Sequence, residues 1–310
     1  MTVLHASRTL IVQKSETNYG ISANPTGTDA LMVSNLSLDL LQLEREDREL
    51  VRGYPGASPQ IVTRQSARIQ FSVELVGSGT PGTAPRYGPC LKACGRSETI
   101  VANTSVTHAR VMSGLSSVTI DAYLDGQRHR MTGCRGTASL SMTVEGIAKY
   151  TFDMLGIYNT PTVIANPSPT FTLQAQPVAV NSDNTPTVSV HGFAACMSEF
   201  SVQDGNQIVF LQPAGCSKEV IIPNRRVTGS ITLQMPLVSA MDFFTIAANQ
   251  AVGPITWTHG TTPGNIITYN APTCAFGAPS LSISDEIYHI ALPFEAQPNT
   301  GNDEDTLVLT

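Results

Sequence analysis

The chain has 310 residues and a formal net charge of −6, with 41% hydrophobic and 14% charged residues. This length fits two domains of ordinary size, and the apolar content excludes a fibre or a disordered tail. Low charge with abundant Ser, Thr, Gly and Pro favours β structure over long Lys/Glu-rich helices.

The first predicted elements are two long strands of alternating apolar residues, which indicate a half-buried antiparallel sheet. They run from Leu31 to Leu41 and from Ala67 to Val76, and a polar excursion over residues 44–64 separates them. A Gly/Pro-rich turn then leads to a short helix predicted from Pro85 to Cys94. We assign residues 1–25 to an N-terminal arm.

Two turn signals follow the helix. Asp125-Gly126, flanked by alternating apolar residues, predicts a two-residue β-hairpin. Glu145-Gly146, shortly before Tyr150, indicates a second hairpin. These elements complete a first module that we place at residues 26–160.

A Pro-rich stretch divides the chain. Three prolines that cannot sit in a central strand predict an extended linker over residues 161–175. The second module is expected at residues 176–298, where Phe200 and Val202 should lead through a turn at residues 204–206 to a return strand at Ile208–Leu211. Residues 299–310 are assigned to a C-terminal tail.

The second half repeats the order of the first. Val227–Met235 alternates, Leu237–Gln250 is predicted to be helical, and apolar strands close the chain up to Phe294. Cys134 and Cys274 hold the same place before the closing strands of the two halves. The expected fold class is therefore mainly β, with two tandem antiparallel β-sandwich or β-barrel modules, each with one flanking helix.

One motif resembles a nucleotide site. Residues 77–82 match G-x-G-x-x-G between a strand and a helix. A parallel Rossmann strand is apolar on both faces, whereas here Gln70 and Glu74 occupy the second face. Pro81 also removes a backbone donor that a phosphate needs. We therefore expect no nucleotide cofactor.

The sequence has no catalytic or metal-binding motif. There is no G-x-S-x-G elbow and no H-E-x-x-H, and the six histidines are scattered singly. Cys90 and Cys94 could share a helix face, but zinc requires two further ligands, so buried thiols are the favoured interpretation. The six scattered cysteines also favour free thiols over a disulfide framework. We predict a protein that is not an enzyme and has no cofactor or metal.

Charge differs between the halves. Residues 1–165 hold 15 Lys/Arg against 13 Asp/Glu, hence +2, and the remainder holds 3 against 11, hence −8. Binding to nucleic acid requires several clustered Lys or Arg. The best cluster, Arg128, Arg130 and Arg135, is more simply a solvated hairpin tip or a set of ion-pair partners for a neighbouring subunit.

Membrane and secretion signals are not evident. No stretch reaches the ~18 apolar residues of a membrane helix, and the first 25 residues lack an apolar run behind a basic start. We expect a protein that is cytosolic when made and has no membrane partner.

Several motifs together resemble those of the phage tail tube proteins, the major tail proteins of siphophages and related prophages. Their order and spacing carry the resemblance, which covers roughly residues 14–248. The segments are Lys14–Gly20, Pro25–Val33, Leu50–Pro59, Val73–Gly79, Pro89–Gly95, Val118–Gly126, Gly133–Gly136, Gly205-Asn206 and Asp242–Phe244.

This resemblance implies tail-tube modules that polymerise as stacked rings around a lumen that conducts DNA. Rings of that family usually contain six modules, so a chain with two modules is expected to form homotrimeric rings. The implied partners are the chain itself, the tail terminator, the tape measure protein, the baseplate proteins, and genomic DNA that passes without specific binding. The implied location is the virion tail, after a stage in the host cytoplasm.

The polar excursion is the candidate interaction site. Loops of about twenty residues in compact domains are usually functional or disordered. This one carries apolar and aromatic anchors together with an arginine, the side-chain types that dominate interfaces. We predict an inter-ring interaction loop that uses Leu50, Val51, Arg52, Tyr54 and Ile61. A solvated flap is the simpler alternative.

Two other functions remain open at this point. One is another ring-forming virion protein of the same module, such as a tail terminator, a baseplate ring or a head decoration protein. Terminators commonly have one module, so the duplication and the long loop favour the tube. The other is a carbohydrate-binding or hydrolase β-sandwich, for which clustered carboxylates and exposed aromatic residues are not evident.

Overall fold

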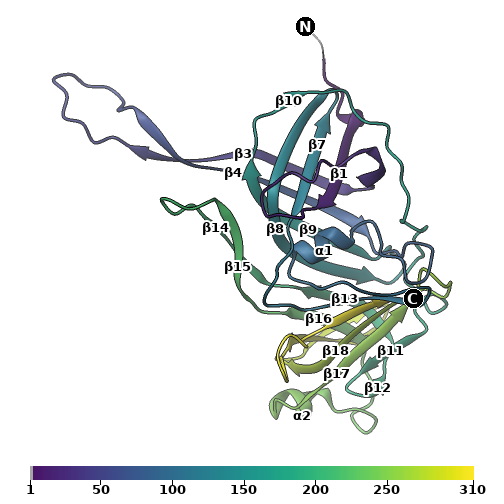
Figure 1. Ribbon diagram of the computed structural model, residues 1–310. Coiled ribbons are helices and arrows are strands. Elements are labelled where there is room, and N and C mark those ends of the chain that lie inside the picture. Colours follow the sequence, from purple (N-terminus) through teal and green to yellow (C-terminus); the bar gives the residue numbers. More distant parts are fainter. Residues whose placement is uncertain (1–2) are drawn as a thin grey trace.

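A computed structural model describes residues 3–310. Antiparallel strands make up most of the described chain, together with two short α-helices and two 3₁₀ turns (Figure 1). The mainly β fold predicted from the sequence is confirmed. The first two residues of the predicted N-terminal arm lie outside the described residues.

The first half of the chain contains nine strands and one α-helix before the Pro-rich segment, which adds a short tenth strand. In order these are β1 (Thr9–Ser15), β2 (Ala30–Leu31), β3 (Ser34–Asp47), β4 (Gln60–Glu74), α1 (Gly88–Ala93), β5 (Thr99–Val101), β6 (Ser105–Ala109), β7 (Val118–Leu124), β8 (Gln127–Thr143), β9 (Lys149–Tyr158) and β10 (Thr162–Val163). The 3₁₀ turns cover Ala6–Arg8 and Gly27–Asp29.

The second half follows with its own strands and helix. In order these are β11 (Thr187–Val190), β12 (Phe193–Ala194), β13 (Met197–Gln203), β14 (Asn206–Leu211), β15 (Glu219–Arg225), β16 (Thr228–Gln234), α2 (Phe243–Ala248), β17 (Val252–His259), β18 (Ile267–Phe276), β19 (Ser280–Ser284), β20 (Ile287–Ala296) and β21 (Thr306–Leu309).

The two halves use the same pairing scheme. Within the first half, β7 pairs with β1 and β8, β4 pairs with β3 and β9, and β8 pairs with β9. Within the second half, β17 pairs with β11 and β18, β16 pairs with β13 and β20, and β18 and β19 together pair with β20. Strands β18 and β19 thus take the place of the long β8, and each half has its α-helix between the equivalent strands β4 and β7 or β16 and β17.

Alternating strands bury one face in each half. In β4, Ile69 and Phe71 are buried while Gln70 between them is exposed, as the period-two pattern predicts. In the second half the rings of Phe200, Trp257 and Tyr269 form a buried aromatic cluster with centroid distances of 5.2–5.6 Å. Each such side chain contributes roughly 1.5–3 kcal/mol through its removal from water.

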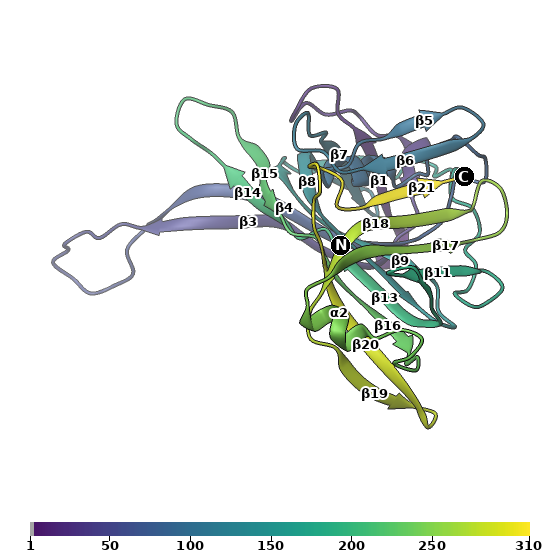
Figure 2. The same ribbon diagram turned by 90° about the horizontal axis from the view of Figure 1, so that it is seen from below.

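Two sheets run through both halves of the molecule. One is continuous from β3 through β4, β9 and β8 of the first half into β13, β16 and β20 of the second. The other joins β11, β17 and β18 to β6 and β5 through the C-terminal strand β21 (Figure 2). The halves are therefore joined by strand pairing on both sheets.

The two helices are shorter than the sequence predicts. The first covers Gly88–Ala93 and ends before Gly95, whose φ of +83° places it in the left-handed region that terminates helices. The second covers only Phe243–Ala248, because the Asp242 carboxylate accepts hydrogen bonds from the backbone N–H groups of Phe244 and Thr245 and starts the helix there. Residues 237–241 form a turn instead.

The predicted loop over residues 44–64 is wrong in its bounds. Strand β3 continues to Asp47 and β4 begins at Gln60, so only residues 48–59 connect them. The result is a long hairpin arm that projects from the body of the molecule (Figure 1). Neither face of the outer strands is buried, so the sequence there lacks the alternation that marks half-buried strands, although Gln60 donates to Asp47 across the hairpin.

The predicted hairpin at residues 204–206 is also wrong. Strand β14 pairs with β15 in a separate two-stranded hairpin, and β13 pairs with β8 and β16. The chain turns away at Gly205, whose φ is +60°, because Asp204 and Asn206 are buried between the halves. Asn206 Nδ2 donates to the carbonyls of Cys94 and Gly136 in the first half.

Both ends of the described chain form strands inside the sheets. Residues 9–15 of the predicted arm form β1, which pairs with β2 and β7. Residues 306–309 of the predicted C-terminal tail form β21. The segment over residues 161–175 has only the short β10, which pairs with β8. The division into modules at residues 26–160 and 176–298 stays a prediction.

Candidate assembly surfaces

The junction between the halves is a buried antiparallel pairing of β8 with β13. Leu140 lies opposite Val202, and Met142 lies opposite Phe200. All four side chains are buried. Two strands from different halves of the chain therefore bury their apolar faces in one continuous core, and we call this pairing the internal joint.

The C-terminal strand β21 closes the junction on the second sheet. It pairs with β6 of the first half on one edge and with β18 of the second half on the other. Leu307 and Leu309 are buried in the core. The end of the chain thus connects the halves a second time.

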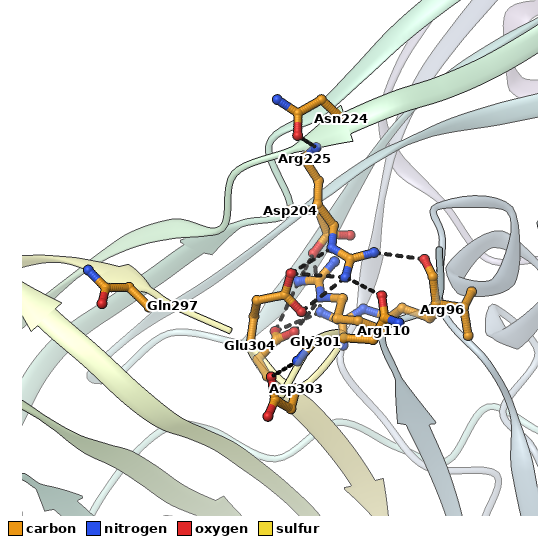
Figure 3. A network of polar contacts seen from close by, with 12 residues as sticks. Arg96, Arg110, Asp204, Asn224, Arg225, Gln297, Gly301, Asp303 and Glu304 are labelled. Atoms are coloured by element: carbon orange, nitrogen blue, oxygen red, sulfur yellow. Dashed lines mark hydrogen bonds and ion pairs between the residues drawn. The ribbon is translucent and has the colours of Figure 1, made fainter. Parts of the chain in front are cut away.

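A buried ionic cluster lies between the two sheets (Figure 3). Arg96 and Arg110 come from the first half, and Asp204 and Asp305 come from the second. Arg96 Nη2 lies 3.1 Å from Asp204 Oδ1 and 2.8 Å from Asp305 Oδ2. Arg110 Nη2 lies 2.6 Å from Asp204 Oδ1, and its Nε also pairs with Asp305. Two positive and two negative groups thus balance across the junction.

Electrostatics favours the charged form of this cluster. Burial alone raises the pKa of Asp305, but the guanidinium groups of Arg110 and Arg96 outweigh it and hold the pKa at about 2. Burial opposes the charge of Arg96, yet the two carboxylates keep its pKa well above the usual value. Removal of one partner would leave a buried charge uncompensated, which is strongly destabilising.

A second ion pair holds the C-terminal segment. Arg225 of β15 donates to both carboxylate oxygens of Glu304, at 2.9 and 3.0 Å, and to the carbonyl of Val111 at 2.7 Å. Figure 3 shows Arg225 beside Glu304, close to the buried cluster. Strand β15 is therefore fixed to both the C-terminal segment and the first half.

The glycine-rich segment over residues 77–82 packs against the second half. Gly77 N donates to Asn265 Oδ1 at 2.7 Å, and Gly79 N donates to the carbonyl of Gly264 at 3.0 Å. A Cβ atom on Gly77 would lie 1.9 Å from that carbonyl oxygen. These glycines allow a close backbone approach between the halves, which accounts for the motif without a nucleotide.

The hairpin arm carries most of the predicted site residues at its end. Leu50, Val51 and Tyr54 are exposed, Val51 fully and Tyr54 at 67%. Arg52 donates to the carbonyl of Ala57 at 3.3 Å, and its guanidinium lies 6.0 Å from the centroid of the Tyr54 ring. The structure therefore brings Arg52 and Tyr54 together beside exposed Leu50 and Val51.

Ile61 differs from the other predicted residues because it belongs to strand β4 rather than to the loop. It is exposed, as is its neighbour Val62. The apolar surface of the arm thus extends from its tip along one strand.

The hairpin β14–β15 lies against the inner part of the arm. Arg64 of β4 is 5.5 Å from the centroid of the Phe210 ring, and Gln212 Nε2 lies 3.5 Å from the carbonyl oxygen of Thr63. Both hairpins project from the same side of the molecule (Figure 2). The longer one extends well beyond the shorter one.

The sheet that runs through both halves, from β3 to β19, is called the through-going sheet. Its two edge strands each lack a partner on one side among residues 3–310. Strand β3 pairs only with β4, and β19 pairs only with β20. Leu281 and Ile283 of β19 are 52% and 64% exposed, and Tyr288 beside them is exposed as well. The sequence predicted the strand at residues 281–283 but not its exposure, because a period-two pattern does not reveal whether its partner belongs to the same chain.

Several side chains that could perform chemistry are buried, and burial suppresses their reactive forms. Burial raises the pKa of Cys90 and Cys274 to about 12, which suppresses the thiolate. Burial lowers the pKa of His108 to about 4, against the opposing effect of Glu98, and its Nδ1 contacts the carbonyl of Ser97. Across residues 3–310, no group of three His, Cys, Asp or Glu is placed to hold a metal.

The fold and these surfaces define a structural β protein with open sheet edges. Residues 6–301 match the family of phage tail tube proteins, so the chain belongs to that family. Its members are structural virion proteins of the phage tail, not enzymes. No curated protein matches the chain. Among the described residues, no helix has the length and apolar character that crossing a membrane requires.

Proposed function

We propose that this chain polymerises as stacked rings into the tail tube and that the lumen of the tube conducts DNA during ejection. The observation that carries the proposal is the pair of open edges, β3 and β19, at the two ends of one sheet that runs through both halves. An unpaired edge is a template for another chain. Two modules per chain favour homotrimeric rings, in line with the six-module rings of the resembling family.

The polar face of the through-going sheet is suited to line the lumen. Two rows of residues cross six strands from β4 to β20 on the side opposite the core. They consist of Ser72, Thr151, Ser139, Gln203, Thr228 and Glu295 in one row, and Glu74, Lys149, Ser141, Ser201, Ser230 and Pro293 in the other. These two rows contain one Lys and two Glu and so offer few phosphate contacts, which would let DNA pass without being retained.

The virion tail is the site of action, and we infer a stage in the host cytoplasm before assembly. Ring stacking requires partners at the two ends of the tube, for which the tail terminator and the baseplate proteins are proposed. The tape measure protein and then genomic DNA would occupy the lumen without specific binding.

The hairpin arm is proposed as the contact between successive rings. Leu50, Val51 and Tyr54 are exposed at its end and are available to a neighbouring ring. Because the second half has only the shorter β14–β15 hairpin, long and short arms would alternate around a ring. Head-to-tail contacts of this kind are heterologous and build an open filament.

Replacement of residues 48–59 by a two-residue Gly-Ser turn tests the arm. Each half should remain folded, because shortening a loop changes its closure free energy only slightly. Rings should persist while tube elongation is lost, as seen by electron microscopy and light scattering. A matched variant with Leu50→Ser, Val51→Ser and Tyr54→Ser keeps the length and should show the same defect.

Tubes of normal length and stability from the shortened protein would refute the arm assignment. A wild-type chain that forms single rings and never stacks would instead favour a tail terminator. A chain that stays monomeric at high concentration, even with a tail initiator complex, would contradict the tube proposal.

A further inference from the structure

The open edge of β19 corresponds to the part of β8 that forms the internal joint. Leu140 of β8 pairs with Tyr150 of β9, and Leu281 of β19 pairs with Ile290 of β20. The second residue after the equivalent cysteine, Gly136 in one half and Phe276 in the other, pairs with a residue of the closing strand. Tyr150 and Ile290 each lie four residues before that pairing partner in their closing strands. Leu281 therefore occupies the place of Leu140.

The open edge of β3 corresponds in the same way to β13. Val202 of β13 pairs with Gly229 of β16, and Leu38 of β3 pairs with Ile69 of β4. Gly229 and Ile69 pair in turn with equivalent residues of the closing strands β20 and β9. Leu38 therefore occupies the place of Val202, and Leu36 that of Phe200.

An irregularity of the backbone supports this alignment. Strand β3 has a register shift between Ser34 and Ser37, and β13 has one between Met197 and Glu199. The shift includes Leu36 in β3 and falls just before Phe200 in β13, so it lies at the start of the apolar pair in one strand and just before that pair in the other. Because bulges are specific features of a strand, these neighbouring positions support the equivalence of the two edges.

We propose that β19 of one chain pairs antiparallel with β3 of the next, with Leu281 opposite Leu38 and Ile283 opposite Leu36. This inference rests on the proposed function, because it specifies how a ring of identical chains closes. The contact repeats the internal joint, in which Leu140 lies opposite Val202 and Met142 opposite Phe200. The partner surface is thus a second copy of the same chain.

Burial distinguishes the closed joint from its open counterpart. The four apolar side chains of the internal joint are buried, whereas Leu281 and Ile283 are more than half exposed. Leu36 and Leu38 are only partly buried against the core. Pairing of the two open edges would cover these four side chains and satisfy the free backbone groups of both strands.

The hydrogen-bond phase of the internal joint predicts which residues approach most closely. Val144 N donates to the carbonyl of Ser198, and Asp204 N donates to the carbonyl of Ala138. Hydrogen-bonded pairs recur at every second residue of an antiparallel pairing, so Ser141 and Ser201 form a non-hydrogen-bonded pair. The Cα atoms of such a pair are about 4.5 Å apart. Ser282 and Ser37 are the corresponding pair across the proposed contact.

Cysteine cross-linking tests the register directly. Ser37→Cys and Ser282→Cys are introduced together into a Cys196→Ser, Cys216→Ser background, because those two native thiols are exposed. In assembled protein the pair should form an intermolecular disulfide, since antiparallel neighbours of this kind meet its distance requirement. Ser141→Cys with Ser201→Cys is the positive control and should give an intrachain disulfide.

Slipped pairs are the matched negative controls. Ser37→Cys with Ser280→Cys, or with Ser284→Cys, places the thiols on diagonal neighbours about 7–8 Å apart. We expect at least a tenfold higher cross-linked fraction for the 37/282 pair on non-reducing gels, with covalent species up to the size of the closed ring.

The outcomes separate this inference from the proposed function. Rings or tubes that cross-link at a slipped pair, or at neither pair, would overturn the β3–β19 register and leave the tube proposal intact. Failure of the cysteine-background protein and the wild type to form rings at all would contradict both.

Discussion

The internal joint and the open edges of this chain are two versions of one strand pairing, and they differ in what surrounds them. The pairing of β8 with β13 is reinforced by the C-terminal strand β21 and by the buried cluster of Arg96, Arg110, Asp204 and Asp305. The open edges have no such additions within residues 3–310. The pairing within one chain is stabilised by these additional contacts. The pairing proposed between chains lacks them but would be repeated at every contact around the ring.

This comparison also explains why apolar residues lie exposed on β19. An isolated domain normally protects its edge strands with charges or prolines. Here Leu281 and Ile283 remain, because their equivalents in β8 are core residues and the proposed assembly buries them in the same way.

The largest effect is expected from a charge on the open edge. Ile283→Lys should abolish rings and tubes, because a buried lysine without a partner is costly at a strand-pairing contact. The thermal midpoint of the unassembled chain should not change, since the side chain is exposed there. Val163→Lys, at another exposed position on β10, serves as the control and should assemble normally. Normal tubes from the Ile283 variant would mean that β19 takes no part in assembly.

The next effect concerns the closed joint. Asp305→Asn leaves Arg96 and Arg110 with one carboxylate between them and should destabilise the chain by about 3–5 kcal/mol. Urea denaturation of unassembled protein measures the loss. Asp183→Asn, at an exposed position, is the matched control and should change stability much less. A loss below about 1 kcal/mol for Asp305→Asn would show that the cluster does not hold the halves together.

Equivalent positions should respond unequally to the same truncation. Phe200→Ala should cost about 3–5 kcal/mol because the ring is fully buried against Trp257 and Tyr269. Leu36→Ala should cost only about 1 kcal/mol in the unassembled chain, since its side chain is only partly buried. The difference between the two stability losses should be smaller in assembled tubes, as measured by thermal scans of the free and the assembled protein. Equal losses in the free chain would argue against β3 as an open edge.

The smallest effect is a pH dependence of the closed joint. The pKa of Asp305 is about 2 in the folded chain and higher in the unfolded chain, so its contribution is fully present above about pH 4 and is lost as the pH falls towards 2. The thermal midpoint of wild type should therefore fall more steeply over this window than that of Asp305→Asn. Parallel curves for the two proteins would contradict the assigned pKa shift.

Local patterns in the sequence were sufficient for much of the fold. The Asp125-Gly126 turn joins β7 to β8 as predicted, and Glu145-Gly146 lies in the turn between β8 and β9. Alternation located β4 and β16 because each buries one face. The outer parts of β3 and β4 escaped recognition because both of their faces are exposed, and the return partner of β14 was misassigned because pairing depends on buried Asp204 and Asn206 rather than on the turn.

The junction itself could not be predicted from local patterns. Arg96 and Asp305 are 209 residues apart in the chain, and neither has a neighbouring residue that signals its partner. Strand β21 is only four residues long and follows a polar turn, so it resembled a tail. The exposed apolar and aromatic residues at the end of the arm were recognisable because Leu50, Val51 and Tyr54 stand in an otherwise polar segment.

Hydrogen–deuterium exchange before and after assembly tests the central claim most directly, namely that the ring closes by a repeat of the internal joint. The amides of β8 and β13 should exchange slowly in both states, because their pairing is present in the free chain. The amides of β3 near Leu38 and of β19 near Leu281 that point away from β4 and β20 should exchange rapidly in the free chain and become protected in tubes. Rapid exchange of these amides in fully assembled tubes would contradict the account.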